Sequence, residues 1–418
     1  MAMQDSNPIR PGGGRQGFKE FVALIAAMMG LTALAIDAML PALPDIGQSL
    51  GVANDNDRQW VLAIFLLGFG AAQIVYGTLS DRFGRKPVLL TGLGLYVAFS
   101  VVAALAPSFE LLLAARFLQG ASVAVSRVLA VSIVRDCFVG RQMARVMSLT
   151  FIVFMAAPIL APAIGQLIMF VAPWRWIFGM LAIAGMAVLA WSALRLPETL
   201  DPRDRLPITF RGVAAAWRRT ITERYSLGYT LAMTLLQGAL FGFLTSVQQI
   251  FFDVFEEPLL FTPVFAVSAG AMALASWQNS RFVVRLGTRL LSHWALLGFI
   301  GFAAVHVLVA WSGLETIWSF ALLQALTMGC FGLAASNFGS MAMEEMGAIA
   351  GSAASVQGLF GTIGGTAIGI FIGQQFNGTT LPMALGFLVC GLLALGVVWL
   401  TEGGRLFHGR EGRPALAE

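Results

Sequence analysis

Asp37 lies in the apolar segment 21–43, and of the 22 aspartates and glutamates in the chain it is the one that hydropathy places well inside such a segment. An acid in the middle of a membrane costs roughly 2.5–3.5 kcal/mol on insertion scales, so one that is retained there normally serves function. Removal from water raises the pKa of a carboxyl group, and a nearby arginine lowers it. A carboxyl group that alternates between these surroundings takes up a proton on one side of a membrane and releases it on the other. We therefore expect Asp37 to carry protons and to form part of a substrate site.

Three basic side chains also fall within apolar segments. Arg116 and Arg127 are eleven residues apart, about three helical turns, and so lie on roughly one face of segment 111–133. Arg127 either draws anionic substrates or binds the backbone of the next helix. His306, in the middle of segment 291–312, either titrates near neutral pH or makes a hydrogen bond in helix packing.

The composition indicates a membrane protein. Of the 418 residues, 58% are hydrophobic and 11% are charged, whereas a soluble domain carries about 25% charged residues. Three widely spaced cysteines indicate neither a disulfide framework nor a thiolate metal site. Because a membrane span needs roughly 20 mostly apolar residues, we predict an all-α protein with twelve transmembrane helices, at 21–43, 59–79, 88–107, 111–133, 146–170, 174–194, 228–251, 261–279, 291–312, 316–340, 347–374 and 381–400.

Positive charge sorts to one side of this topology. With both termini in the cytoplasm, 22 of the 26 Lys and Arg residues fall on the inside, as expected for an inner-membrane protein. The positive balance is therefore topological, and nucleic acid is not expected as a partner. The predicted parts of the chain are a cytoplasmic tail (1–20), a six-helix bundle (21–194), a cytoplasmic central loop (195–226), a second six-helix bundle (227–401) and a cytoplasmic tail (402–418).

The two six-helix halves carry a similar sequence pattern at corresponding positions. Arg82-Phe83 and a later basic residue follow the second span, and Arg281-Phe282 and Arg285 follow the eighth. Parallel repeats with a site between them near the middle of the membrane are typical of secondary transporters.

The loop between the second and third spans carries a spaced set of glycines, an acid and basic residues that resembles a loop motif of the major facilitator superfamily: Gly77, Asp81, Arg82, Gly84, Arg85 and Lys86. The resemblance implies that this loop latches the two halves together in an outward-open state. We expect Arg85 to pair with Asp136, and Asp81 to meet the helix N-terminus near Gly347. Gly77 is expected to allow close helix approach. The alternative is that these are ordinary positive-inside charges.

Two further segments resemble motifs of the same superfamily. Arg116-Phe-Leu-Gln119-Gly120 is similar to its second motif. The run from Pro158 through Pro162 to Gly165 is similar to the motif of its exporters, although Ala161 and Gln166 replace the usual glycines. The alternative for this run is a simple packing kink.

Three segments are similar to the bicyclomycin-resistance (Bcr/CflA) group of drug:proton antiporters: Asp37 to Pro44, Arg127 to Asp136, and Gly351 to Gly358. The resemblance places the first and fourth spans along a central cavity, so we expect Arg116 to be the partner of Asp37. The alternative is a fixed Asp37–Arg116 ion pair that only orients the first helix.

Other polar and aromatic side chains are candidates for the substrate cavity. Gly361, Gly365, Gly369 and Gly373 are spaced four apart, so we expect a second helix to pack on them, either as a moving interface or as static packing. The candidate cavity residues are Gln119, Arg127, Gln237, Phe241, Gln248, Gln324, Asn337 and Gln357.

These observations predict a monomeric transporter that exports small drug-like molecules in exchange for protons, with no cofactor, no metal and no other coupling ion. The chain has no Gly-x-x-x-x-Gly-Lys-Ser/Thr motif for ATP. A proton symporter that imports a metabolite is the main alternative. A membrane enzyme would need clustered catalytic side chains, and a passive channel would not need a latch motif. The sequence names no particular substrate.

Overall fold

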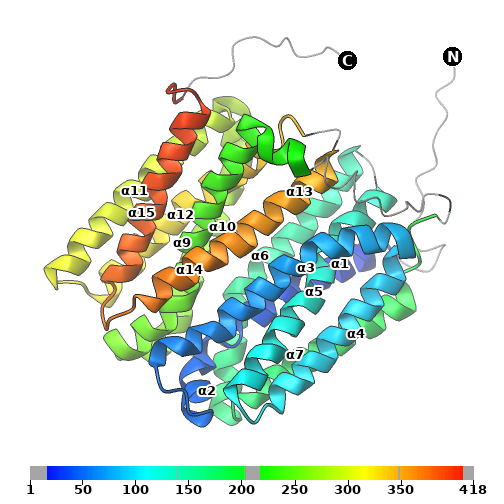
Figure 1. Cartoon of the computed structure of the whole chain (residues 1–418), viewed down its shortest axis with the longest axis horizontal. Coiled ribbons are helices and arrows are strands. Elements are labelled where there is room, and N and C mark those ends of the chain that lie inside the picture. Colours follow the sequence, from blue (N-terminus) through cyan, green and yellow to red (C-terminus); the bar gives the residue numbers. More distant parts are fainter. Residues whose placement is uncertain (1–16, 139, 202, 204–216, 347–348, 408–418) are drawn as a thin grey trace. The chain divides into compact units, whose positions relative to one another are not determined.

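The computed structural model describes residues 17–138, 140–201, 203, 217–346 and 349–407 (Figure 1). These residues form helices joined by short connections, and the described part of the chain contains no strand. The chain divides into two compact units, Met1–Phe210 and Arg211–Glu418. The division falls inside the charged segment 195–226, which the sequence assigns to a central loop. The all-α architecture predicted from hydropathy is confirmed.

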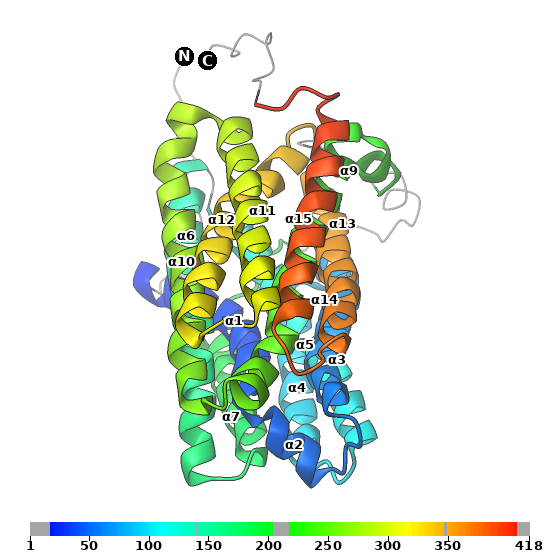
Figure 2. The same ribbon diagram turned by 90° about the vertical axis from the view of Figure 1, so that its left-hand side faces the viewer.

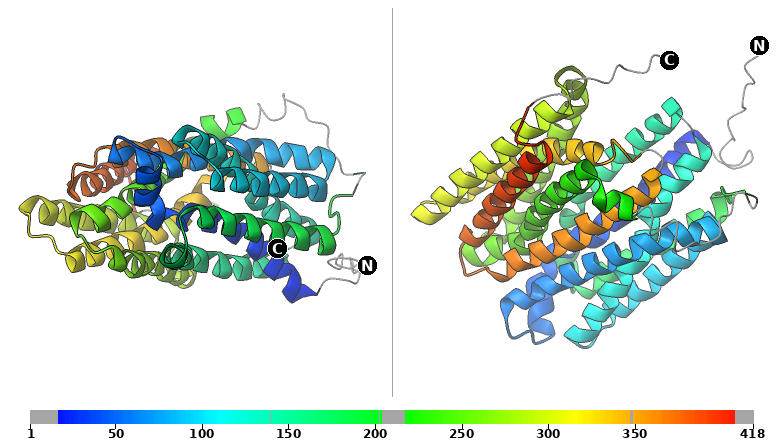
Figure 3. Two further views of the ribbon diagram at one scale, coloured as in Figure 1. Left: turned by 90° about the horizontal axis from the view of Figure 1, so that it is seen from below. Right: turned by 45° about the horizontal axis from the view of Figure 1, so that its top comes forward.

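The first unit is a bundle of long helices joined by short turns, coloured blue to green in Figure 3. Its elements are α1 (Phe18–Asp37), η1 (Leu40–Ala42), α2 (Leu43–Ser49), η2 (Asp55–Gln59), α3 (Trp60–Phe83), α4 (Arg85–Ala104), α5 (Phe109–Cys137), α6 (Gly140–Val171) and α7 (Arg175–Arg195).

The second unit repeats this plan, and Figure 2 shows α13, η6 and α14 following one line beside α15. Its elements are α9 (Arg224–Gln249), η4 (Ile250–Val254), α10 (Pro258–Leu286), α11 (Thr288–Ser312), α12 (Ile317–Ala342), α13 (Ala350–Leu359), η6 (Phe360–Gly364), α14 (Gly365–Gln374) and α15 (Leu381–Thr401).

A helix occupies each of the twelve predicted spans. Eleven helical segments among the described residues are long and apolar enough to cross a membrane. The remaining span is α6, a helix of 32 residues whose second part, Ala156–Val171, is apolar. The largest difference from the prediction is the first span, which runs from Phe18 to Ser49 through α1, η1 and α2. Asp37 is therefore further from the end of its span than the segment 21–43 suggested.

Small residues set the closest helix contacts of the first unit. A Cβ added to Gly68 on α3 would lie 2.1 Å from the Phe117 carbonyl oxygen, and one added to Gly120 on α5 would lie 2.1 Å from that of Phe65. Each glycine thus lets the opposite backbone approach, which is how helices associate closely within lipid. The predicted close approach at Gly77 is wrong within the described residues, because a Cβ there would meet no atom within 4 Å.

The predicted glycine stripe of the second unit packs on α9. A Cβ on Gly365 would lie 3.1 Å from Cγ of Gln237, and one on Gly369 would lie 2.6 Å from Cβ of Phe241. Gly361 has no such contact, since nothing lies within 4 Å of the added atom. Gly361 lies within the π-helical turn η6, so a regular four-residue spacing does not hold there.

The repeat between the halves is confirmed in conformation but not in the register that the Arg-Phe pairs suggested. Gly84 joins α3 to α4 with φ +100° and ψ 156°, and Gly287 joins α10 to α11 with φ +81° and ψ 155°. A positive φ is readily adopted by glycine alone. When these two glycines are aligned, Arg82 corresponds to Arg285. The Arg-Phe pairs in the sequence had matched Arg82 with Arg281, which is four residues earlier.

Candidate functional site

Asp37 is the last residue of α1, at the point where the first span changes from α1 to the 3₁₀ turn η1. Its side chain is buried, with 4% of its surface exposed. No hydrogen bond or ion pair joins its carboxylate to another residue in the part of the chain that the structure describes. The neighbouring Pro41 is also buried, so this break in the first span is not exposed.

Arg116 is fully buried on α5, where it binds backbone and amide groups of three helices. Its Nε donates to the carbonyl oxygen of Val61 at 3.1 Å, and Nη2 donates to that of Ala35 at 3.2 Å. Nη1 donates to Oε1 of Gln119 at 2.7 Å. The guanidinium also lies 4.2 Å from the ring centroid of Phe65, a cation–π contact.

The expected ion pair between Asp37 and Arg116 is absent from the described structure. Arginine presents five N–H donors in a fixed fork, and here α1 and α3 carbonyls and an amide oxygen accept from them. The Ala35 carbonyl is two residues before Asp37, so the positive charge nevertheless lies close to the end of α1. The alternative of a fixed pair that orients α1 is therefore wrong, and the orienting contact is to the backbone.

Gln119 extends this contact to a fourth helix. Its Nε2 donates to Oγ of Ser100 on α4 at 2.7 Å, and Ser100 donates to the carbonyl oxygen of Tyr96 at 2.7 Å. Gln119 is fully buried with both polar atoms bonded. The Arg116–Gln119 motif thus fixes α5 against its neighbours, and Gln119 is not free to line a cavity as the sequence analysis expected.

The exporter-like motif of α6 lies against the same break in the first span. Pro158 and Pro162 are both accommodated inside the helix. A Cβ added to Gly165 would lie 1.8 Å from the carbonyl oxygen of Ala38 and 3.2 Å from Cγ of Pro41. Gly165 therefore lets α6 touch the backbone next to Asp37. This contact connects the motif to the buried carboxylate.

Arg85 is the centre of a charged network between the ends of α3, α4 and α5. Nε donates to Oδ2 of Asp136 at 2.9 Å, which confirms the pairing predicted from the sequence. Nη1 donates to Oδ1 of Asp81 at 2.5 Å and to Oγ of Ser80 at 2.7 Å. Arg85 is 3% exposed and the Asp136 side chain 14%, so their pair is shielded from solvent, whereas the Asp81 side chain is 40% exposed. The expected contact of Asp81 near Gly347 lies outside the described residues.

Glu198, after α7, completes this network and was missed by sequence reasoning. Its carboxylate accepts from the backbone N–H of Arg85 at 2.8 Å and of Lys86 at 3.2 Å, the first residues of α4. An acid at a helix N-terminus accepts hydrogen bonds from the free N–H groups and interacts favourably with the positive end of the helix dipole. Lys86 Nζ donates to the Ala193 carbonyl at 2.8 Å, and Arg82 is exposed.

A second network occupies the corresponding helix ends of the second unit. Arg289, on α11, donates from Nε to Oε1 of Glu402 at 2.8 Å and from Nη2 to Oε2 of Glu344 at 3.0 Å. The hydroxyl of Tyr229 also donates to Glu402. In the sequence, Arg289 counted only among the positive residues that set the topology. The repeated pattern of a glycine linker and a basic residue at the start of the next helix was the signal that could have found this network.

Arg127 differs from Arg116 although the two lie on one face of α5. Its side chain is exposed, and within the described residues it makes no hydrogen bond to the backbone of α6. The packing alternative for Arg127 is thus not seen, and an attraction for anionic groups remains the open prediction.

The candidate cavity residues of the second unit have different surroundings. Asn337, on α12, forms a pair with Asn279 on α10, with Nδ2 to Oδ1 distances of 2.8 and 3.4 Å. Gln357 donates to the carbonyl oxygen of Ala342 at 3.1 Å. Gln237 and Phe241 lie against the glycines of α14. Asn337 therefore serves helix packing in this structure.

His306 has a carboxylate partner. Its Nε2 lies 2.8 Å from Oε1 of Glu315, and both side chains are almost fully buried. The Thr380 hydroxyl donates to the other carboxylate oxygen of Glu315, which ties the segments before α12 and α15 together. The His306 ring also meets Phe320 edge-on at 5.4 Å. The hydrogen bond expected of a packing residue is thus present at His306.

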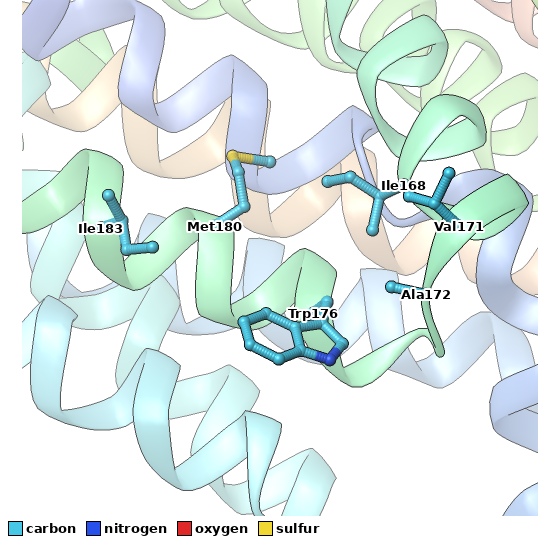
Figure 4. Close-up of a pocket in the computed structure, with 6 residues that line it drawn as sticks. All are labelled: Ile168, Val171, Ala172, Trp176, Met180 and Ile183. Atoms are coloured by element: carbon cyan, nitrogen blue, oxygen red, sulfur yellow. The ribbon is translucent and has the colours of Figure 1, made fainter.

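A shallow apolar hollow lies at the turn between α6 and α7 (Figure 4). Six residues line it: Ile168, Val171, Ala172, Trp176, Met180 and Ile183. Val171, Ile183 and Trp176 are each more than 60% exposed, as expected of a surface that faces lipid acyl chains. None of the predicted site residues borders it.

Comparisons with known proteins agree with this architecture. A family model described as Major Facilitator Superfamily matches residues 25–373. The uncharacterized MFS-type transporter YdgK of Bacillus subtilis is 30% identical over 394 residues, covering 92% of this chain and 96% of that protein. The bicyclomycin resistance protein homolog of Haemophilus influenzae is 28% identical over 385 residues, covering 91% and 96%. The multidrug resistance protein MdtL of Escherichia coli is 28% identical over 387 residues, covering 92% and 96%.

A solved structure extends the similarity to the fold. The crystal structure of the human organic anion transporter MFSD10 (TETRAN) matches with a TM-score of 0.63 and 18% identity, covering 92% of this chain and 99% of that one. At this identity the likeness concerns the fold.

Proposed function

The chain belongs to the major facilitator superfamily, and we propose that it exports small drug-like molecules in exchange for protons. Membership makes it a multi-pass membrane transporter and not an enzyme. The names of the bicyclomycin-resistance and multidrug-resistance relatives support drug-like substrates. We further propose that the protein is a monomer in a bacterial inner membrane. Both termini are proposed to lie in the cytoplasm, because most of the positive residues fall on that side of the predicted topology.

The observation that carries proton exchange is the buried Asp37 carboxyl group. It has no hydrogen-bond or ion-pair partner among the described residues, so no fixed contact holds it in one protonation state. Arg116 is bonded to the Ala35 carbonyl of α1, two residues before Asp37, so a movement of α1 against α5 would change the separation of the two charges. Asp37 is therefore the proposed proton carrier. Arg116 is the residue proposed to position the end of α1 and to set the electrostatic potential around Asp37.

The contact of α6 with the first span supplies a way to couple proton exchange to transport. Gly165 lets α6 reach the Ala38 backbone, so a shift of α6 changes the surroundings of the neighbouring Asp37 directly. A carboxyl group that loses its apolar cover becomes a stronger acid. The two Pro residues and Gly165 thus support export by alternating access, with the α1–α6 contact as the moving part.

The two charged networks are proposed to keep each half together during transport, with the loop motif around Arg85 at the gate. The Arg85–Asp136–Asp81 and Arg289–Glu344–Glu402 groups connect helix ends within each half. Such contacts support alternating access in which one half moves as a body against the other. The driving force is adequate for export. One charge moved through 100 mV contributes roughly 2.3 kcal/mol, which sustains about a fiftyfold substrate gradient.

The test is substrate-induced proton release in detergent. A panel of antibiotics that includes chloramphenicol is added to weakly buffered protein, and the pH change is recorded for the wild type and Asp37→Asn. Asp45→Asn is the matched control, because Asp45 lies in the same span but is exposed. Release in the wild type and control, with none in Asp37→Asn despite retained binding, supports antiport through Asp37.

Two results would contradict the proposal. Proton release that persists in Asp37→Asn would assign the coupling to another group. Proton uptake on substrate binding would favour the symport alternative, since a symporter binds its proton and substrate together.

A further inference from the structure

Two buried glutamines of the second unit have unsatisfied side chains. Gln248 near the end of α9 and Gln324 on α12 are both 0% exposed. The Oε1 and Nε2 atoms of both have no hydrogen-bond partner among the described residues. A buried polar group left without a hydrogen-bond partner destabilises a folded protein. Four such atoms on two side chains call for a partner that is not part of the described protein.

The two glutamines lie at the same level of neighbouring antiparallel helices. Near one end, the Tyr229 ring on α9 meets Phe338 on α12 at 5.4 Å. Near the other end, Phe251 meets Phe320 at 5.8 Å. Gln248 is three residues before Phe251, and Gln324 is four residues after Phe320. A step of four residues keeps a face of an α-helix, so Gln324 lies one turn inward from this aromatic contact on the same face of α12. Gln248 lies at the same level, near the end of α9 and just before the π-helical turn that carries Phe251.

Other buried amides of this protein do have partners. On the same helix α12, Asn337 pairs with Asn279 through two hydrogen bonds. In the first unit, Gln119 bonds both Arg116 and Ser100. The fold therefore satisfies amides where they serve packing. The Gln248–Gln324 pair is an exception, at a place where the backbone is also irregular, because α9 continues directly into the π-helical turn η4. Short π-helical turns in α-helices are frequent at functional sites.

Aromatic rings lie beside the two amides along their helices. Phe251 is packed edge-on against Phe255, Phe261 and Phe320, with ring centroids 5.8–6.0 Å apart. The Phe320 ring also meets the His306 ring, at 5.4 Å between centroids. A site of apolar rings with a few convergent polar groups is the usual composition of a small-molecule pocket.

Building on the proposed export function, we infer that Gln248 and Gln324 form a binding subsite for an uncharged hydrogen-bonding group of the substrate, such as an amide or a hydroxyl. Each carboxamide offers both donors and an acceptor, so two of them can bind an amide group on its donor and acceptor sides at once. The flanking Phe251 and Phe320 rings would cover the apolar part of the same molecule. Because the two amides are already removed from water, binding recovers their hydrogen bonds without a new desolvation cost for the protein.

The first arm of the test needs no ligand. Thermal unfolding is measured in detergent for the wild type, for Gln248→Leu/Gln324→Leu, and for Asn337→Leu as the matched control. Replacing unpartnered amides by apolar groups of similar size leaves the fold as stable or more stable, so the double variant is expected to keep or raise the wild-type melting temperature. Asn337→Leu is expected to lower it by breaking the pair with Asn279. A double variant that melts well below the wild type would overturn the inference, because the amides would then have partners in the free protein.

The second arm compares two probes in binding and export assays. Chloramphenicol carries an amide and two hydroxyl groups, whereas tetraphenylphosphonium carries no hydrogen-bonding group. The double variant is expected to lose affinity for chloramphenicol by at least about tenfold, since two or more neutral hydrogen bonds of about 1 kcal/mol each are lost. Its affinity for tetraphenylphosphonium is expected to stay within about twofold of the wild type.

The outcomes separate this inference from the function on which it rests. Equal losses for both probes, or no loss for either, would overturn the subsite. If the wild type bound neither probe and no other antibiotic of the panel, drug export would be contradicted, and the subsite would be decided by the unfolding comparison alone.

Discussion

Replacing Gly165 by alanine tests whether the α1–α6 contact couples proton exchange to transport. The added Cβ would lie 1.8 Å from the Ala38 carbonyl oxygen, whereas such atoms in proteins essentially never approach within 3.0 Å. The contact must therefore open by at least about 1.2 Å. The obstacle is backbone and cannot rotate away, so α6 or the η1 turn has to move. Because Ala38 directly follows Asp37, the carboxyl group moves with it.

The size of the effect follows from this geometry. Overpacking of a well-packed interior costs about 1–3 kcal/mol, which in a unit of this size lowers the melting temperature by roughly 2–12 °C. We expect the larger effect on coupling. Export driven by a pH gradient is expected to fall at least about tenfold, while binding of the same substrate changes less, because the α1–α6 contact works during the conformational change.

The assay is export of chloramphenicol into inverted membrane vesicles energised by a pH gradient, together with substrate binding and thermal unfolding in detergent. Gly94→Ala is the matched control. Gly94 lies inside α4, where an added Cβ meets no atom within 4 Å. Alanine there is expected to leave export unchanged and to raise stability slightly, by about 0.4–1 kcal/mol.

Normal export by Gly165→Ala, with the melting temperature of the wild type, would refute the reasoning, since α1 and α6 would then not be in contact as described. A lower melting temperature with normal coupling would refute the moving-contact role and leave Gly165 as a packing residue.

Two further predictions concern the charged groups. In a double-mutant cycle of Arg85→Gln and Asp136→Asn, we expect a coupling energy of about 1–3 kcal/mol by thermal unfolding, because the two side chains are bonded at 2.9 Å and largely buried; additive effects within about 0.5 kcal/mol would show that they do not interact. For Arg116→Lys, we expect a clearly lower melting temperature, since one ammonium group cannot reach the carbonyls of α1 and α3 and the Gln119 amide together. Arg175→Lys is the control, because Arg175 is half-exposed and bonded to the Ala106 carbonyl. This control is expected to melt near the wild type.

The helices were predictable because lipid imposes one rule on every span. The backbone of a spanning segment must satisfy its own hydrogen bonds, and its side chains must be mostly apolar for about 20 residues. Each predicted span accordingly coincides with a helix. The departures occur where the chain is irregular: the first span continues through η1 to Ser49, and α13 and α14 are joined by a π-helical turn. Hydropathy does not register such local changes of helical type.

Pairings were predictable only where a spaced motif was present. The Arg85–Asp136 pair followed from the loop motif, and it is present. The equivalent network around Arg289 has no such motif and was missed. Arg116 was expected beside Asp37, because the family resemblance places the first and fourth spans along one central cavity. In the structure the Arg116 guanidinium instead donates to backbone carbonyl groups of α1 and α3. A sequence does not indicate which carbonyl groups will accept, because every residue has one.

The sequence by itself determined the membrane class, the twelve helices, the family, and Asp37 as the one acid deep in an apolar segment, because each of these depends on composition and local spacing. Tertiary structure alone decided which groups those residues meet. It placed Gly165 against the Ala38 backbone, bound Arg116 to α1 and α3, paired Asn337 with Asn279, and left Gln248 and Gln324 unpaired. Helix rotation and register set these contacts. They result from packing over the whole bundle and are not encoded in any one segment.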